Sequence, residues 1–394
     1  MNELNPVFPH DNARIGIYLH IPFCRTRCHY CAFVTNPYDP ELADQYLRSL
    51  SREFQLQREP GRLAELFRNA IADTIYFGGG TPSLIRPDSV AELVSECRST
   101  FRTVAEPEIT IELNPASVIR AALRELLVAG VNRVSLGVQS LEDDELKGMG
   151  RTHTARDALR TFEALRNVGF DNISVDLIAG FPGQSRTSFA RSIRRVLELR
   201  PEHLSIYLLE LKPGTKLDAK IRSGELPPLD DDLAAELYED LCSAVTSAGY
   251  EQYELSNFAR EGLYCRHNLK YWSDEIYLGF GAGAHGMTGR ARYANVEDVA
   301  TYRECIDSDQ LPVSSVTEMT PEVRFKDALI MGLRLVKGLD LDRLGARYGV
   351  DARDFVEKTI GDLHAAGLFM LDGHNLRLTP RGRLLSNTIF SRWV

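Results

Sequence analysis

The sequence predicts an α/β fold, with a parallel sheet of six strand–helix units followed by a smaller, mainly helical C-terminal domain. Between about residues 15 and 250, short β-rich runs alternate with amphipathic helical stretches. Repeated units of this kind imply parallel strands joined by helical crossovers. After residue 250 the alternation stops, and mainly helical patterns follow.

Each predicted strand is a short run of β-branched, aromatic and apolar residues. The six runs cover residues 15–20, 74–77, 108–113, 133–138, 173–178 and 204–209. After the first run, apolar residues recur at helical spacing from Leu42 to Phe54. Two later helices, one predicted at 118–129, end at Gly130 and Gly169, and glycine often stands just past a helix end. Six such units fit either a doubly wound sheet or a partial barrel, and periodicity does not separate the two.

The region after residue 250 combines several different patterns. Residues 277–286 form a glycine run too apolar for a linker, so we expect a strand and tight loop packed back on the sheet. A helical segment starts at Glu322, residues 369–378 form a hairpin pattern, and a final helix begins at Pro380, which resembles a winged helix. We expect four parts: an arm at 1–14, a core at 15–250, a connecting segment at 251–300 and a C-terminal domain at 301–394.

Composition excludes some classes of function. The net charge of -9 argues against bulk nucleic-acid binding, which needs Lys and Arg to neutralise phosphates. No apolar run approaches the ~20 residues of a membrane span, and residues 1–13 are too polar for a signal peptide. We therefore expect a cytoplasmic protein without an integral membrane segment, in which cysteines are thiols or metal ligands.

Three cysteines in one short loop are the strongest chemical signal. Cys24, Cys28 and Cys31 form a CxxxCxxC pattern, which suits an iron–sulfur cluster. A [4Fe–4S] cube normally takes four thiolates, so three would leave one iron open to a small molecule. A disulfide would leave one thiol over. Zinc would need His20 or His29 as a fourth ligand, and no second CxxC accompanies the loop.

Unusual residues also follow the other predicted strands. A Gly-Gly-Gly-Thr-Pro run follows the second strand, Glu112 ends the third, Gln139 follows the fourth, and Asp176 interrupts the apolar fifth. Sites in parallel α/β folds form at the carboxyl ends of the strands. A buried acid is costly without a partner, so these two acids are either members of ion pairs or parts of a site. Their common edge favours a site.

Four motifs together resemble the radical S-adenosylmethionine (SAM) superfamily. They are Tyr18-Leu-His-Ile-Pro-Phe-Cys24 with its cysteine loop, the glycine run at 78–82, Glu-Leu-Asn-Pro at 112–115 and Ser-Leu-Gly-Val-Gln-Ser at 135–140. The resemblance spans nearly the whole chain and implies a partial (β/α)6 barrel, with a [4Fe–4S] cluster on the three cysteines and SAM on the open iron. It implies these SAM contacts: Tyr18, Gly79, Gly80, Thr81, Glu112, Gln139, Arg151 and Asp176. An acid can accept from ribose hydroxyls, and an arginine can pair with the SAM carboxylate.

The matching branch contains oxygen-independent coproporphyrinogen III dehydrogenases and haem chaperones of the HemW type. The dehydrogenases resemble CxxxCxxCxC, whereas Phe33 stands at the last of those positions here, as in the chaperones. Residues 267–272 match the HNxxYW motif that HemW-like proteins use for haem, which implies the contacts His267, Asn268, Tyr271 and Trp272. Histidine is a usual axial haem ligand. The alternative for this segment is a core histidine with aromatic packing.

The sequence therefore favours a haem chaperone with a cluster and SAM, which delivers haem to acceptor proteins. An electron donor and a monomeric or homodimeric state belong to this interpretation, and whether the chain is an enzyme stays open. Three alternatives remain: a coproporphyrinogen III dehydrogenase acting by oxidative decarboxylation, a related radical SAM methyltransferase, and a zinc-stabilised binding module.

Overall fold

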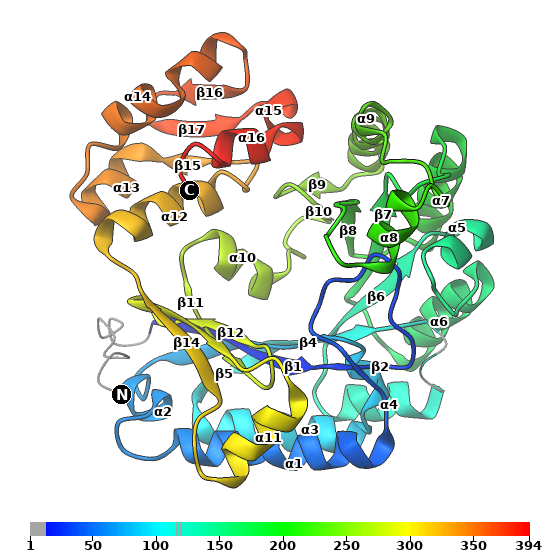
Figure 1. Ribbon diagram of the computed structural model, residues 1–394, viewed down its shortest axis with the longest axis vertical. Coiled ribbons are helices and arrows are strands. Elements are labelled where there is room, and N and C mark those ends of the chain that lie inside the picture. The colour runs from blue at the N-terminus through cyan, green and yellow to red at the C-terminus, as the bar shows by residue number, and fades with distance from the viewer. Residues whose placement is uncertain (1–12, 116, 118–119) are drawn as a thin grey trace.

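The computed structural model describes residues 13–115, 117 and 120–394. Its main sheet has 12 strands in the order β14-β13-β12-β11-β1-β4-β5-β6-β7-β8-β10-β9 (Figure 1). The parallel strands from the predicted units are β1 (Arg14–Ile21), β4 (Ile71–Gly79), β5 (Arg102–Leu113), β6 (Arg133–Gln139), β7 (Ile173–Ala179) and β8 (His203–Leu208). This arrangement confirms the predicted α/β class.

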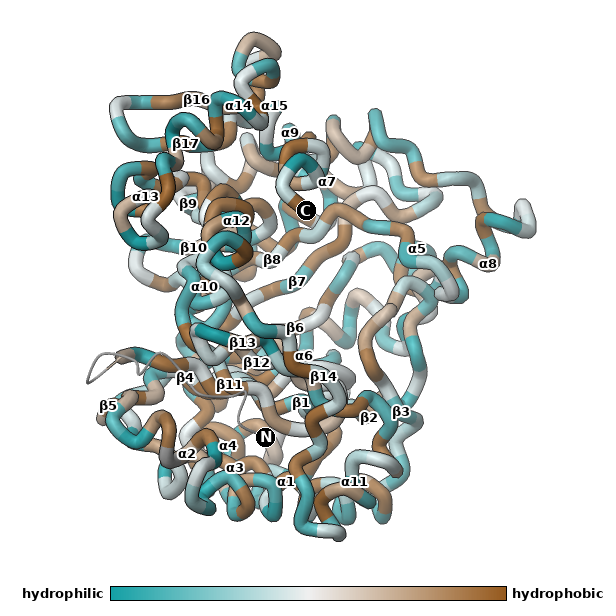
Figure 2. The backbone as a smooth tube through the Cα atoms, turned by 60° about the vertical axis from the view of Figure 1, so that its left-hand side comes forward, coloured by the Kyte–Doolittle hydropathy of each residue, from teal (hydrophilic) through white to brown (hydrophobic). Residues whose placement is uncertain are grey.

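Helices cover the outer face of these strands, and shorter helical segments lie in the connections between them (Figure 1). They are α1 (Pro40–Gln57), α2 (Leu63–Leu66), the 3-10 turn η1 (Pro82–Leu84), α3 (Pro87–Thr100), α4 (Arg120–Val128), α5 (Asp143–Gly148), α6 (Ala155–Val168), α7 (Arg186–Leu199), α8 (Lys216–Arg222) and α9 (Asp231–Ser247). Local sequence sets their ends. In α6, Thr154 and Asp157 form a capping box, and Gly169 ends the helix with φ 106°. Hydrophobic segments follow the strands, and hydrophilic ones lie largely on the surface (Figure 2).

The largest difference between the predicted and the observed strand boundaries is in the third strand. The third strand begins at Arg102, not at residue 108, because Arg102 and Thr103 pair with Ile71 and Ala72 before a register shift. Glu106 and Pro107 stand between the two paired stretches of this strand, so its hydrophobic pattern does not show that the strand is continuous. For the helix predicted at 118–129, residues 118 and 119 lie outside the described part of the chain, as do residues 1–12 of the predicted arm.

Later strands extend the sheet at both edges. Antiparallel β10 (Asn257–Ala259) and β9 (Glu251–Gln252) follow β8, and β11 (Ile276–Phe280) pairs in parallel with β1. Antiparallel β12 (His285–Met287), β13 (Ala291–Asn295) and β14 (Val313–Glu318) complete that edge, with α11 (Val299–Asp307) outside. The predicted strand and tight loop after residue 276 are thus confirmed. A small β2 (Phe23–Cys24) and β3 (Asn36–Pro37) pair frames the cysteine loop.

The C-terminal region has its own hydrophobic core. It contains α12 (Pro321–Gly332), β15 (Leu339–Asp340), α13 (Leu341–Tyr348), α14 (Ala352–Ala365), β16 (Phe369–Asp372), β17 (Asn375–Leu378), α15 (Pro380–Leu384) and α16 (Ser386–Phe390). The predicted hairpin is present, and the final helix breaks into two at Leu385. Among the described residues, no helix is both long and apolar enough to cross a bilayer.

The C-terminal region meets the sheet through α10 (Arg266–Trp272) and the turn after it. The buried Asp274 carboxylate pairs with Arg324 at 3.1 Å and with Arg347 at 2.9 Å. The Arg334 guanidinium lies 4.4 Å from the centre of the Trp272 ring. Because α10 also packs on β1, β4 and β11, it is one structural link between the two cores, beside the Arg292–Asp327 ion pair and the bridge between Glu254 and Leu335.

The buried carboxylate of Glu53 connects helix α1 to one edge of the sheet. Glu53 of α1, which is 1% exposed, accepts hydrogen bonds from the Gly281 amide (2.9 Å), the Asn295 amide group (3.2 Å) and the Tyr302 hydroxyl (2.7 Å). Burial raises the pKa of Glu53 from its ordinary 4.5 to about 7, against the lowering effect of these bonds. The folded protein therefore binds the proton of the Glu53 carboxyl group more tightly than the unfolded chain does.

The substitution Glu53→Gln should weaken the pH dependence of folding stability. Between pH 4.5 and 7 the folded state of the wild type holds more protons on Glu53 than the unfolded state, so stability falls as pH rises through this window. The Glu53 contribution to that fall is on the order of 3 kcal/mol, and a glutamine removes it. Urea unfolding at pH 5 and pH 8 measures the difference. Parallel pH profiles for the two proteins would show that Glu53 titrates normally.

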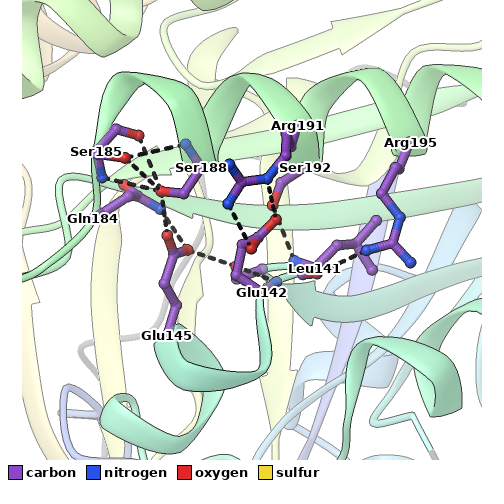
Figure 3. Close-up of polar contacts among 10 residues, drawn as sticks. Leu141, Glu142, Glu145, Gln184, Ser185, Ser188, Arg191, Ser192 and Arg195 are labelled. Carbon is purple, nitrogen blue, oxygen red and sulfur yellow. Dashed lines mark hydrogen bonds and ion pairs between the residues drawn. The ribbon is translucent and has the colours of Figure 1, made fainter.

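A second polar cluster joins α5 to α7. Figure 3 shows Glu145 of α5 facing the start of α7, with Gln184 and Ser188 directed toward its carboxylate. Glu145 accepts from the Ser140 and Ser188 hydroxyls, both at 2.6 Å, and from the Gln184 amide group at 3.1 Å. Nearby, Arg191 pairs with Glu142 at 2.8 Å. These contacts fix the turn that precedes Arg151.

Replacing Glu145 by alanine should lower the free energy of unfolding by about 3 kcal/mol, because two buried donors and the partly buried Ser188 hydroxyl lose their acceptor. Glu163→Ala on the exposed face of α6 is the control and should change stability by less than about 0.5 kcal/mol. Urea denaturation followed by circular dichroism compares the two variants. Equal stabilities for both would contradict a structural role for the Glu145 cluster.

Candidate functional site

The carboxyl ends of the parallel strands surround a cavity of about 500 Å³. Its walls come from the cysteine loop after β1 and from the ends of β4, β5, β6, β7 and β8. Among the predicted site residues, the lining includes Cys24, Cys28, Cys31, Gly79, Gly80, Thr81, Glu112, Gln139, Arg151 and Asp176. Parallel pairing explains the gathering, because it places all these strand ends at one edge.

The three cysteines face this cavity as free thiols. The Cys24 sulfur lies 3.4 Å from the Thr81 hydroxyl, and Arg151 donates to the Cys28 sulfur at 3.5 Å. Burial raises the pKa of the Cys24 and Cys31 thiols, so their thiolates need a cationic centre beside them. Iron in a cluster provides that centre, and the all-sulfur donor set suits it.

In the described part of the chain, no three His, Cys, Asp or Glu side chains lie close enough to share one metal ion. A single zinc ion needs its ligands about 2.3 Å from one point, whereas a cube binds each thiolate at a separate iron. His20 hydrogen-bonds to the Tyr18 hydroxyl (3.1 Å) and to the Val34 carbonyl (3.0 Å). His29 bonds to the Gly148 carbonyl at 2.8 Å. These contacts favour a cluster over the zinc alternative.

Two partly buried acids face the cavity from neighbouring parts of the sheet. Glu112 accepts from the Tyr76 hydroxyl and from the Gly79 amide, both at 3.1 Å. Burial, together with the charge of Asp176, raises the pKa of Glu112 from 4.5 to about 7. Asp176 accepts from the Ser135 hydroxyl at 2.9 Å, and burial raises its pKa too. Both acids are acceptors placed to bind hydroxyl or cationic groups of a ligand.

The backbone around the cavity has conformations that few side chains permit. Gly79 has φ +114°, and a Cβ there would lie 2.6 Å from the His20 ring. A Cβ on Gly80 would lie 2.8 Å from the Phe23 carbonyl oxygen. Gln139 has φ 67°, which is unusual for a non-glycine residue and typical of functional positions. The absence of side chains at Gly79 and Gly80 lets this loop lie directly against His20 and Phe23, which lead into the cysteine loop.

Arg151 is held at the cavity wall by neutral acceptors. Its guanidinium donates to the Asn114 side-chain oxygen at 3.0 Å and to the Gly137 carbonyl at 2.6 Å. Its buried Nε has no partner among the described residues. An arginine with these neutral neighbours and a spare donor fits the carboxylate of a ligand. The cavity thus fits a cluster and an amino-acid-containing ligand such as SAM.

Tyr18 is the predicted SAM residue that is not part of the cavity lining. It lies on β1, where its hydroxyl bonds to His20 and its ring packs 6.2 Å from that of Tyr76. It therefore contacts the residues behind the cavity wall. A direct contact with SAM remains a prediction.

The predicted haem residues lie on α10, near the amino-terminal ends of the same strands. The His267 ring is 1% exposed, and its nitrogens bond to the Thr74 hydroxyl at 2.8 Å and the Tyr271 hydroxyl at 3.0 Å. Burial, with the charges of Lys270 and Arg133, lowers the pKa of His267 to about 3. Asn268, Tyr271 and Trp272 are partly buried. The structure therefore places the motif in a packed, aromatic environment, and its role in haem binding remains a prediction.

Sequence reasoning assigned no role to several residues of the cavity. Asn114 holds Arg151, Ser135 holds Asp176, and Tyr30 and Tyr207 contribute aromatic wall. Asn114 and Ser135 lie within the quoted motifs, so the motifs alone offered a signal. Tyr207 belongs to an ordinary strand pattern, so nothing in the sequence indicated that it lines the cavity. Its side chain is 44% exposed because of the segments that surround this strand end, and these come from distant parts of the chain.

Comparisons with known proteins agree with this architecture. The radical SAM superfamily model matches residues 18–196, and the HemN C-terminal domain model matches residues 319–385. Among solved structures, the coproporphyrinogen III oxidase HemN from Escherichia coli has a TM-score of 0.86 at 25% identity, covering 99% of this chain and 92% of that chain.

Relatives similar over nearly their whole length include the haem chaperone HemW of Bacillus subtilis, 36% identical over 96% of this chain and 98% of the relative. The radical S-adenosyl methionine domain-containing protein 1 of Mus musculus is 41% identical, over 94% of this chain and 85% of the relative. HemW of Mycobacterium tuberculosis is 36% identical over 98% of this chain and 96% of the relative. The chain therefore belongs to the HemW family of the radical SAM superfamily.

Proposed function

We propose that the protein is a haem chaperone that binds haem and transfers it to acceptor proteins. The observation that carries this proposal is the near full-length identity of 36% to proteins named haem chaperone HemW. A local feature supports it. Phe33, not a cysteine, stands two residues after Cys31, and its side chain is 67% exposed beside the cavity.

The proposal includes two resident cofactors. Cys24, Cys28 and Cys31 would hold a [4Fe–4S] cluster, with SAM completing the coordination of the open iron. Arg151 would pair with the SAM carboxylate, and Glu112 and Asp176 would accept hydrogen bonds from its hydroxyls. When bound, the pair supplies one-electron chemistry, while the protein orients the cofactors and excludes side reactions.

Haem binding by the motif at 267–272 belongs to the same proposal. Ligation of haem iron by one ring nitrogen of His267 would require that nitrogen to give up its bond to Thr74 or Tyr271, and α10 to become accessible. We further propose a cytoplasmic location, an electron donor, and a monomeric or homodimeric state.

The second candidate is oxygen-independent oxidation of coproporphyrinogen III. The fold match to HemN, with a TM-score of 0.86, favours keeping it. Phe33 in place of a further cysteine counts against it, since the resembling dehydrogenases carry CxxxCxxCxC.

Anaerobically reconstituted protein should take up about one haem per chain, seen as a shift of the Soret band, and should pass it to an apo-acceptor. It should convert no coproporphyrinogen III to protoporphyrinogen IX in the presence of SAM and a reductant, with HemN as positive control. Conversion at rates like those of HemN, without haem uptake, would establish the second candidate instead. 5′-Deoxyadenosine assayed on the same samples reports whether SAM is cleaved.

SAM binding should strengthen about tenfold as pH rises from 6 to 8. Glu112 has a pKa of about 7, and its ionised form is the stronger hydrogen-bond acceptor. Equilibrium dialysis of reconstituted protein with radiolabelled SAM measures this dependence. Glu112→Gln should bind SAM weakly with a flat pH profile. A wild-type profile without a step near pH 7 would exclude Glu112 as the titrating acceptor.

A further inference from the structure

A chain of contacts links the motif helix α10 to the candidate SAM site. The ring of His267 stacks on that of Tyr76, with ring centres 5.1 Å apart and planes 29° apart. The Tyr76 hydroxyl donates to Glu112 at 3.1 Å, and the other Glu112 oxygen accepts from the Gly79 amide. His267 therefore touches a residue that holds a wall of the cavity, although its own ring lies outside the cavity lining.

The packing around these rings is close. A Cβ on Gly16 would lie 3.0 Å from the His267 ring, and a Cβ on Gly78 would lie 3.0 Å from the Tyr76 ring. A Cβ on Gly78 would also come within 2.8 Å of the Tyr18 ring. Because both glycines admit the rings so closely, Tyr76 has little room to shift while His267 stays in place.

The position of His267 is itself fixed at both ends of α10. Glu108 accepts from the amides of Arg266 and His267, both at 3.0 Å. The buried Lys270 ammonium pairs with Asp73 at 2.8 Å and with Glu275 at 2.9 Å. Together with the Thr74 and Tyr271 bonds to the ring, these contacts hold the imidazole against Tyr76.

We propose that His267 and Tyr76 are positioning residues for SAM: the His267 ring holds the Tyr76 ring, and the Tyr76 hydroxyl aims the Glu112 carboxylate into the cavity. The proposal rests on SAM binding as proposed above. It gives the histidine of the HNxxYW motif a task in the haem-free protein that needs no metal ligation.

The test uses full-length protein with reconstituted cluster, and measures the dissociation constant of SAM by equilibrium dialysis. Tyr76→Phe removes only the hydroxyl and should weaken SAM binding about tenfold, the effect of one hydrogen bond to a charged group. The matched control is Tyr302→Phe, which removes a hydroxyl from the buried Glu53 and should leave SAM affinity unchanged. Iron and sulfide content must match the wild type.

Two substitutions of His267 separate ring packing from ligation. His267→Ala should weaken SAM binding severalfold. In a Tyr76→Phe background the same substitution should weaken it clearly less, because the effects of substitutions at two residues in contact are not additive. His267→Phe keeps a ring against Tyr76 but has no nitrogen, and should restore most of the SAM affinity. Haem titration of the same samples reports ligation independently of SAM.

The pH dependence of SAM binding distinguishes the loss of the Tyr76 hydroxyl from a loss of packing, because a loss of packing would not shift the step near pH 7. Loss of the Tyr76 hydroxyl removes a contact that lowers the pKa of Glu112, so the step in SAM binding near pH 7 should move to higher pH in Tyr76→Phe. The other ionisable groups that interact with Glu112 are Asp176, Tyr18, Tyr207 and Tyr271. None of these is altered in the variant.

Unchanged SAM affinity in Tyr76→Phe, or equal losses in Tyr76→Phe and Tyr302→Phe, would overturn the proposal. So would a His267→Ala variant that loses haem while it binds SAM like the wild type. A wild-type protein that holds a cluster but binds no SAM would instead refute the SAM part of the proposed function, and this proposal with it.

Discussion

Parallel pairing of the strands β1, β4, β5, β6, β7 and β8 is the constraint on which the candidate site depends. It turns every carboxyl-terminal strand end toward one edge, where the cysteine loop, the glycine loop and the two partly buried acids meet around a single cavity. Register matters as much as direction. Side chains alternate between the two faces of a strand, so a slip of one residue in β5 or β7 would turn Glu112 or Asp176 away from the cavity.

Around the cavity, charged and hydrogen-bonding groups do not offset the cost that burial imposes on the ionised forms of two acids and two thiols. Burial raises the pKa of Glu112, Asp176, Cys24 and Cys31, so each of these groups resists the charge that its proposed role requires. Perturbed acids and thiols that converge in one cavity are a mark of functional sites. Hydroxyl and amide donors hold the two acids in place, while an iron centre would stabilise the thiolates. The site is thus preorganised for cofactors that bring positive charge.

Helix α10 joins three parts of the molecule. Its first turn is bound by Glu108, its His267 ring packs on Tyr76 behind the cavity wall, and its end meets the C-terminal region through Trp272 and Asp274. A ligand or partner that displaced α10 would therefore disturb both the C-terminal contacts and the residues that support Glu112. If haem binds at the motif as proposed, its effect on α10 would reach the SAM site through His267, Tyr76 and Glu112.

The sequence by itself determined the α/β class, the six parallel strands and the cysteine loop, because hydrophobic periodicity and motif spacing are local properties. With the family resemblance, it also named ten of the residues that line the cavity. It did not separate a barrel from a doubly wound sheet without a family resemblance, and it missed the early start of β5 at Arg102. Only the tertiary structure decided that Asn114 and Ser135 hold Arg151 and Asp176, and that His267 lies buried against Tyr76. Those outcomes depend on which distant segments pack together, and the burial of a side chain is a property of its neighbours in space.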